Sequence, residues 1–377
     1  MADLRRIIPP ANVNEAILSA IIRHATFVER LKTGEANQVV RFLDDNVLPD
    51  ILSTIEKELR RLPRRPSSRE RRLGVLTRDL RDVIRSGFGD VRAESKSRIQ
   101  AFGVNEVDWL AKTIRQVMPI EFEMVIPPGQ VVRAAIGTTG PTKDILGHSW
   151  NDWWNNLSQR TTSTTMQQVR IGISAGESVP RMVRRIRGTR RSGFKDGTWA
   201  TTRREAAAVV RTTMNHVSSQ ARSELTKAND DLIKEEKWLS TLDSRTTVIC
   251  AALDGRVFKP GEGLRPPAHV QCRSVVVPVL KSFREMGIDL DDPPPPTRAA
   301  RQYKDLKTAL SGKVPSDVTY GKWLRNQPVG VQNAVLGPGK AKIFRAGRVK
   351  IERFTNSQNR PLTLQELKKL DSEFLTG

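Results

Sequence analysis

The stretches KWLSTLDSRTTVICAALDGRVF (residues 237–258) and RPPAHVQCRSVVVPVL (residues 265–280) carry the most specific residue pattern in this 377-residue chain. They contain both of its cysteines and one of its four histidines. A strand-like segment at 237–240, a turn signal at Asp254–Gly255 and an apolar, β-branched run at 274–279 are separated by loops. The pattern predicts a small mixed α/β domain with a knot-like arrangement of loops.

Polar side chains are expected to fix the turn TLDSRT at residues 241–246. Asp243 and Ser244 can hydrogen-bond to neighbouring backbone amides, as such residues commonly do in turns. Arg245 is expected to pair with Asp243 or with Asp254 across a tight loop. We therefore interpret Asp243, Arg245 and Asp254 as determinants of the local fold.

Cys250, His269 and Cys272 are soft ligands that could converge on one zinc ion, with Asp243 or Asp254 as a fourth ligand. The segment has no Cys-x-x-Cys pair, because Thr247 stands three positions before Cys250. The two cysteines could instead pack in a small core, or form a disulfide after release from the cell. The residue pattern leaves these three interpretations open.

The rest of the chain is mainly helical by pattern. Apolar residues recur at helical spacing over about 12–62, with a break expected at Thr33–Gly34. The alternating segment at 120–132 predicts a strand pair or hairpin, and an apolar stripe from Val210 to Leu232 predicts a long helix. The expected fold class is α+β: a mainly helical N-terminal region, the small central domain and a short C-terminal α+β extension.

The chain is strongly basic, with a net charge of +22. A polyanion is the expected neighbour, and an aromatic content of 5% disfavours single-strand binding by base stacking. Two segments concentrate the charge: 61–100, with 12 basic and 5 acidic residues, and 160–204, with 11 basic and 2 acidic residues. The residues predicted to contact nucleic acid or a protein partner are Arg64, Arg65, Arg71, Arg72, Arg181, Arg184, Arg185, Arg187, Arg190 and Arg191.

Apolar runs in this chain are short. None approaches the ~20 residues needed to span a bilayer, and the N-terminal residues lack the apolar core of a signal peptide. Two cysteines in so long a chain do not form a disulfide scaffold. These features predict a protein made in a reducing cytoplasm, without a membrane span.

Taken together, the central residues resemble the phage head morphogenesis proteins, also called the Mu F-like minor head proteins. Members often carry further cysteines where this chain has Thr247 and Ser274. Residues 320–337 also resemble the tail that frequently follows this domain. The matching positions are Arg211, Thr212, Asn215, His216, Ala221, Arg222, Trp238, 242–246, Cys250, 253–255, Phe258, Pro266, Pro267, His269, Cys272 and Arg273.

The resemblance and the composition together suggest five regions. They are a helical region with a basic loop at 1–100, a mixed region with a basic, Gly-rich segment at 101–204, the Mu F-like domain at 205–285, a Pro-rich linker at 286–300 and a tail domain at 301–377. The structural motif would comprise Trp238, Asp243, Arg245, Cys250, Asp254, Gly255, His269, Cys272 and Arg273.

The resemblance implies a minor structural protein of a tailed-phage or prophage head. Its partners would be the portal protein, the major capsid or scaffolding protein and packaged double-stranded DNA. It would lie inside the head near the portal, would occupy the host cytoplasm during assembly, and could be delivered with the genome. The expected protein is not an enzyme and has no cofactor, apart from the zinc interpretation above.

The alternative is a metal-dependent nuclease or another DNA-processing enzyme. His269 would then serve as a general base beside a divalent ion. Such a site needs further His or Asn ligands at defined spacing, and His269 is the only histidine in the motif.

Overall fold

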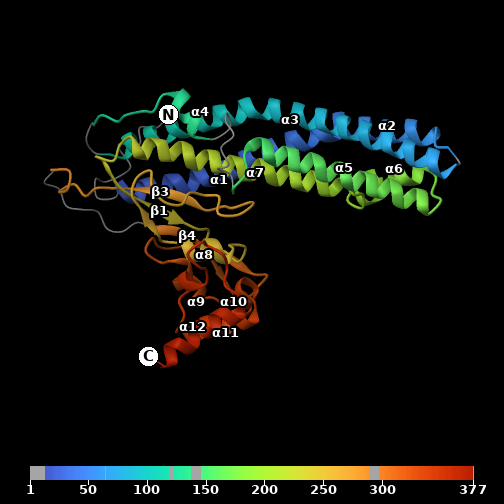
Figure 1. Ribbon diagram of the computed structural model, residues 1–377. Helices are drawn as coiled ribbons and strands as arrows, with labels where there is room; N and C mark the ends of the chain where they lie inside the picture. The colour runs from blue at the N-terminus through green and yellow to red at the C-terminus, as the bar shows by residue number, and fades with distance from the viewer. Residues whose placement is uncertain (1–12, 64, 119–121, 137–145, 288–296, 377) are drawn as a thin grey trace. The chain divides into compact units, whose positions relative to one another are not determined.

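The computed structural model describes residues 13–63, 65–118, 122–136, 146–287 and 297–376 (Figure 1). The chain divides into two compact units. We call the first the motif unit; it comprises the chain up to residue 28, residues 103–135 and the chain from residue 218 onward. The helical unit comprises residues 29–102 and 136–217. The fold class is α+β, as predicted.

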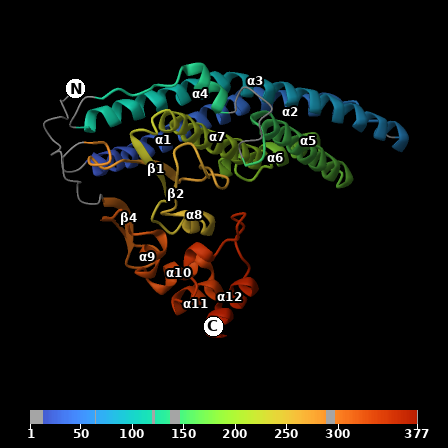
Figure 2. The same ribbon diagram turned by 60° about the vertical axis from the view of Figure 1, so that its left-hand side comes forward.

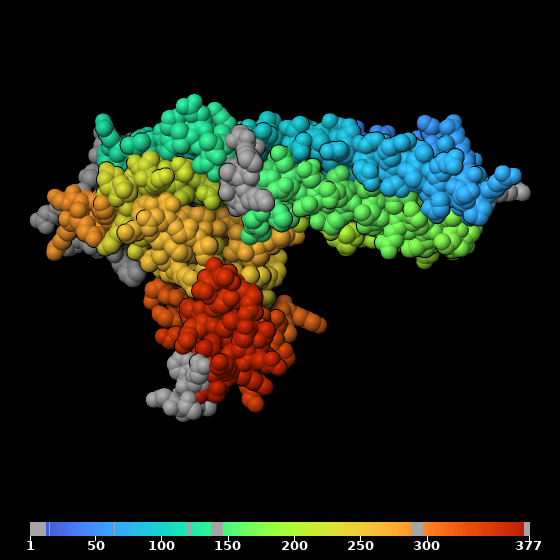
Figure 3. Space-filling model, viewed as in Figure 1, coloured from blue at the N-terminus to red at the C-terminus, as the bar shows by residue number. Residues whose placement is uncertain are grey.

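Long helices supply most of the helical unit. Their apolar faces form its core, in which Leu43, Ile55, Phe88, Trp154 and Trp199 are almost fully buried. In the space-filling view, the surfaces of α3 and α5 lie side by side (Figure 3). The unit takes residues from α1 (Val13–Phe42), α3 (Pro66–Val117) and α7 (Trp199–Lys227), and contains η3 (Leu43–Val47), α2 (Leu48–Arg60), α5 (Trp150–Ser174), α6 (Val179–Arg187) and η4 (Arg190–Ser192).

Helix boundaries differ from the sequence prediction at two places. The break expected at Thr33–Gly34 is wrong, since α1 continues to Phe42. A helical glycine costs only about 1 kcal/mol relative to alanine, and burial of Ala36 and Val39 on the same helix offsets this cost. The interruption comes instead at η3, just before Pro49 in the first turn of α2, because proline has no N–H to donate to the preceding turn.

Helix α3 begins at Pro66 and runs 52 residues. Pro63 and Pro66 predict a loop over residues 61–68, with the helix resuming near Arg71, and for residues 66–68 this prediction is wrong. Proline suits the first turn of a helix, where its missing N–H would have no helical partner. The pattern GISAGESVPRMVRRI (172–186) predicts a turn and then a short helix with Pro180 in its first turn, and α6 confirms this prediction. Gly172 lets α5 approach α6, because a Cβ there would lie 2.3 Å from Cγ of Met182.

The hairpin expected at 120–132 is wrong within the described residues. Residues 122–128 form no strand, and α4 (Gly129–Ala135) follows directly. Asn229 replaces a strand partner for this segment: its side chain accepts from the Val125 amide and donates to the Val125 carbonyl, each at 2.8 Å. One side chain thus satisfies both backbone groups of Val125, which a neighbouring strand would otherwise bind.

The motif unit contains two small antiparallel sheets. The first has the order β2–β1–β3, from β1 (Ile233–Leu239), β2 (Val257–Phe258) and β3 (Val275–Leu280), with Trp238 paired to Val276. The short helix α8 (Val248–Leu253) lies between β1 and β2 in the chain. The second sheet is a hairpin of β4 (Thr297–Tyr303) and β5 (Ala309–Pro315), and Leu242 bridges to Ala300 beside it.

Short helices complete the motif unit, and they pack together at its C-terminal end (Figure 2). Their core includes Tyr320, Trp323 and Phe344, and also Leu242 and Ala251 of the central motif. The motif and the C-terminal residues therefore share one hydrophobic core. The helices are α9 (Tyr320–Arg325), α10 (Val329–Leu336), α11 (Pro338–Ala346), η5 (Ile351–Arg353) and α12 (Leu364–Thr376).

Among the described helices, none is both long and apolar enough to cross a bilayer.

Candidate functional site

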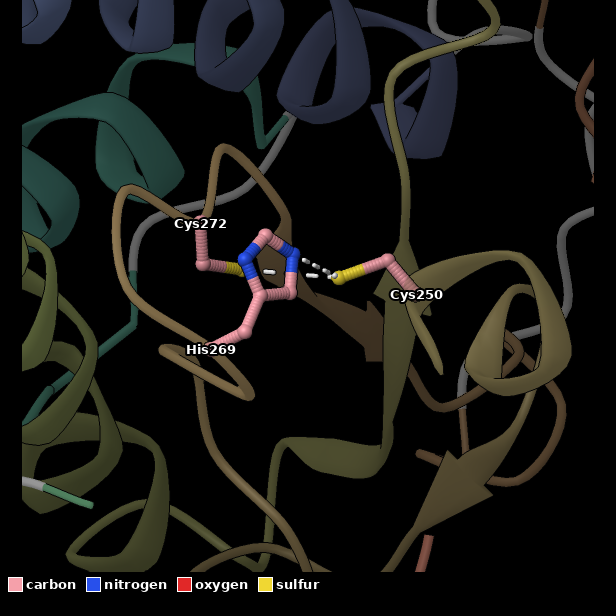
Figure 4. A group of neighbouring side chains, drawn as sticks. All are labelled: Cys250, His269 and Cys272. Carbon is pink, nitrogen blue, oxygen red and sulfur yellow. Dashed lines mark hydrogen bonds between the residues drawn. The ribbon is translucent and has the colours of Figure 1, made fainter. Parts of the chain in front are cut away.

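The structure brings Cys250, His269 and Cys272 together in the motif unit (Figure 4). Cys250 lies on α8, which Thr247 caps by accepting a hydrogen bond from the Cys250 amide, and the other two residues lie on the loop before β3. The Sγ atom of Cys250 is 3.1 Å from Nε2 of His269 and 3.6 Å from Sγ of Cys272. All three potential ligand atoms lie within 4.8 Å of one another. Both cysteines are buried and His269 is half-buried.

The ring of His269 is held in one orientation. Its Nδ1 atom lies 2.9 Å from the Val270 carbonyl oxygen, which can only accept, so Nδ1 carries a hydrogen. In the neutral ring, Nε2 therefore holds the lone pair, and this nitrogen faces Cys250. The cluster thus presents two sulfurs and one nitrogen lone pair to a common point.

The two thiols differ in acidity. The contact with Cys272 and burial both raise the pKa of Cys250. Hydrogen bonding from Cys250 and His269 outweighs burial and holds the pKa of Cys272 well below its usual value. Burial lowers the pKa of His269, but its contacts with Cys272 and the Val270 carbonyl outweigh this effect and raise it.

Asp243 holds the turn TLDSRT through hydrogen bonds and ion pairs, with the expected partner Arg245 and also with Arg273. Both of its oxygens accept from the Arg273 guanidinium, at 2.7 and 2.8 Å, and Oδ1 also accepts from the Arg245 amide at 3.0 Å. The Arg245 side chain is 74% exposed, with Nε 3.7 Å from the carboxylate. Burial would raise the pKa of Asp243, but Arg273 lowers it below its usual value. Arg273 thus links this turn to the residue that follows Cys272.

Asp254 forms the most buried ion pair of the site. Its side chain is 0% exposed, and the Arg298 guanidinium, 3% exposed, donates to both of its oxygens at 2.9 and 3.0 Å. It also accepts from the backbone amides of Ser240 and Tyr320. Gly255 follows with a φ of +84°, a conformation that favours glycine, and its amide donates to the Trp238 carbonyl.

Sequence reasoning missed Arg298, which lies 44 positions from Asp254 in the segment expected to be a linker. The available signal is charge balance: two aspartates in a buried motif need cationic partners, and the sequence prediction names Arg245 alone for both. The domain boundaries themselves remain predictions.

A third ion pair holds the loop that leads to His269. Glu236 is buried and accepts from Arg265, from the Gly261 amide at 2.9 Å and from Thr226 at 2.8 Å. Burial raises the pKa of Glu236 above its usual value despite the charge of Arg265. The loop is therefore attached to both β1 and α7.

The prediction of Asp243 or Asp254 as a fourth zinc ligand is wrong. Both carboxylates are saturated by arginine and backbone donors, and neither belongs to the cluster of Cys250, His269 and Cys272 among the described residues.

The serine hydroxyls of Ser240 and Ser274 lie 3.2 Å apart, and Ser240 donates to the Cys250 carbonyl at 2.7 Å. Trp238 donates to Ser240 at 3.0 Å, which places the buried indole behind the cluster.

The predicted basic residues have different environments in the helical unit, and Arg64 lies outside the described residues. Arg72 pairs with Glu58 at 2.7 Å, and Arg185 pairs with Glu177, which Arg181 also approaches at 3.5 Å. These contacts attach the arginines to the fold. The exposed members of the set are Arg65, Arg71, Arg181, Arg184, Arg187, Arg190 and Arg191.

A polar groove of about 630 Å³ between α3 and α5 was not predicted. Arg81, Arg85 and Arg170 line it together with Asn155, Gln159 and several hydroxyl groups. In the described part of the chain, no ion pair neutralises Arg81 or Arg85. The sequence identifies the basic segments 61–100 and 160–204, which contribute the arginines of this groove. It does not predict that α3 and α5 lie next to each other.

Comparison with known proteins identifies one family. Residues 164–277 match the family described as Phage Mu protein F like protein. The match begins within α5 and includes α6, α7 and the cluster of Cys250, His269 and Cys272. No curated protein and no solved structure matches the chain. The family match confirms the resemblance found in the central residues; the tail at 320–337 lies outside the match.

Proposed function

Residues 164–277 form a Phage Mu protein F-like domain, and from this premise we propose that the chain is a minor structural protein of a tailed-phage or prophage head. It joins the procapsid at the portal, contacts packaged DNA and accompanies the genome toward the exit. The family match is the observation that carries this proposal. The test is whether purified particles contain the protein, and whether its presence depends on the portal.

The chemistry of the motif supports a structural role. Asp243 and Asp254 are occupied by arginines, so their carboxylates serve the fold. The neighbours of His269 are two thiols and a backbone carbonyl, in contrast to the oxygen and nitrogen ligands that the nuclease alternative needs. We therefore keep the head protein as the proposed function.

The charge distribution supports contact with DNA. The groove between α3 and α5 offers guanidinium groups beside amides and hydroxyls, which are the usual protein partners of phosphate oxygens. Such contacts carry no base specificity, which suits a protein that meets packaged DNA of any sequence. The exposed arginines of α6 and η4 add positive charge to the same unit.

Reversing three charges of the groove, in Arg81→Glu, Arg85→Glu and Arg170→Glu together, is expected to weaken binding to duplex DNA and to flatten its salt dependence. Each lost phosphate contact removes about 0.9 from the slope of log K against log salt concentration. Fluorescence anisotropy with a labelled duplex at several salt concentrations measures this slope.

The matched control reverses three exposed cations of the motif unit: Arg256→Glu, Lys259→Glu and Lys313→Glu. Its net charge equals that of the groove variant, so a general electrostatic effect would lower both slopes equally. Equal slopes for the two variants would contradict a DNA contact at the groove.

A further inference from the structure

We propose that Cys250, His269 and Cys272 bind one zinc ion, with the fourth coordination position left to water or to a group from a partner. This inference is independent of the proposed function, because the site could stabilise the domain in any setting. It starts from the donor atoms, all three of which lie within 4.8 Å of one another.

The spacing of the donor atoms fits a tetrahedral ion. Zn–S bonds of about 2.3 Å and Zn–N bonds of about 2.0–2.1 Å place two sulfurs roughly 3.8 Å apart and a sulfur and a nitrogen roughly 3.6 Å apart. The observed distances from Cys250 Sγ are 3.6 Å to Cys272 Sγ and 3.1 Å to His269 Nε2. These two distances are within about 0.5 Å of the values that zinc requires, and the third pair of donor atoms, on His269 and Cys272, lies within 4.8 Å. Figure 4 shows the imidazole and the two sulfurs directed toward one another.

The surroundings of the ligands also fit a metal site. Ligating histidines usually donate their other ring N–H to a carboxylate or carbonyl oxygen, and His269 does so to Val270 at 2.9 Å. Ser240 holds the carbonyl of Cys250, while the Cys272 amide donates to the His269 carbonyl at 3.1 Å. The ligands therefore come from a short helix and a loop that neighbouring hydrogen bonds fix before any ion arrives.

The chemical type of the three ligand atoms determines which metal ion the site prefers. Thiolates and imidazole favour zinc over magnesium or calcium, which prefer oxygen ligands. Two thiolates balance the charge of a divalent zinc ion, so the complete site is neutral and can lie in a buried pocket. No Asp, Glu, Cys or His among the described residues joins the three ligands, which leaves the fourth position to water or a partner.

The first test measures the zinc content of the full-length protein, purified without chelator, by mass spectrometry of the metal. We expect one zinc per chain in the wild type. His269→Ala and Cys272→Ser should lose it, while His148→Ala, which removes an exposed histidine outside the cluster, should retain it. Circular dichroism of each variant separates loss of metal from loss of the fold.

A second readout uses cobalt and does not depend on any variant. Cobalt added to the chelated wild-type protein should give the strong visible bands of tetrahedral coordination and a thiolate charge-transfer band, and zinc should displace it. A folded, reduced wild type that binds neither metal would overturn the proposal. So would a Cys250–Cys272 disulfide in the protein recovered from particles, detected by mass spectrometry without reductant.

Discussion

Arg298→Met is expected to lower the free energy of unfolding by about 3–5 kcal/mol, the range found when one partner of a buried ion pair is removed. The Asp254 carboxylate would lose its ion-pair partner in a site where its side chain is 0% exposed. The backbone amides of Ser240 and Tyr320 would be its main remaining donors. The loss should appear in chemical denaturation at neutral pH, followed by far-UV circular dichroism.

Arg245→Met is the matched control for this variant. The Arg245 side chain is 74% exposed, so its removal should change stability by no more than about 0.5 kcal/mol. The double variant Asp254→Asn with Arg298→Met should recover part of the loss, because no charge is left unpaired. Equal destabilisation by Arg298→Met and Arg245→Met would show that the buried pair does not organise the motif.

Glu106→Gln is expected to destabilise the protein by about 3 kcal/mol at neutral pH. Glu106, on α3, accepts from Arg222 at 2.5 Å, from Ser218 at 2.6 Å and contacts His24 at 2.5 Å. Burial would raise the pKa of Glu106, but Arg222 and His24 lower it from 4.5 to about 2. A carboxylate with a depressed pKa contributes stability above its unfolded value, and that contribution is lost as the pH falls.

The downward direction of the Glu106 pKa shift gives the pH window for this test. In the wild type, the contribution of Glu106 should be complete above about pH 4.5 and disappear toward pH 2, whereas Glu106→Gln lacks it throughout. Urea denaturation between these values can use the fluorescence of Trp109, which stacks on His24 with ring centroids 3.6 Å apart. Glu262→Gln, at an exposed position of the same unit, is the control. A constant stability difference between wild type and Glu106→Gln across the window would contradict this account.

The locally determined parts of the structure could be predicted from the sequence. The turn at Asp254–Gly255, the strands beside it, α6 and the long helix α7 depend on signals within a few residues. The residue types of Cys250, His269 and Cys272 suggest convergence on one point as one of the open interpretations, and the structure brings the three together. The chemical type of the ligands could therefore be predicted from the sequence, but the distances between them could not.

Contacts between residues distant in the chain could not be predicted. Arg298 reaches Asp254 across 44 positions, and Asn229 reaches Val125 across 104 positions. Arg245 pairs with Asp243, whereas the partner of Asp254 is the distant Arg298. Asn229 binds the Val125 backbone where the sequence predicted a hairpin. A single sequence shows that a buried carboxylate or an extended segment needs a partner, but it does not show which residue the fold brings there.

The central claim is that the chain is a minor head protein that enters the particle through the portal. The most direct measurement is the amount of tagged protein in density-purified particles from the producing host, with and without the portal gene, normalised to the major capsid protein. The account predicts a few copies per particle with the portal and none without it. Absence from particles that contain the portal, with all of the protein free in the lysate, would contradict it.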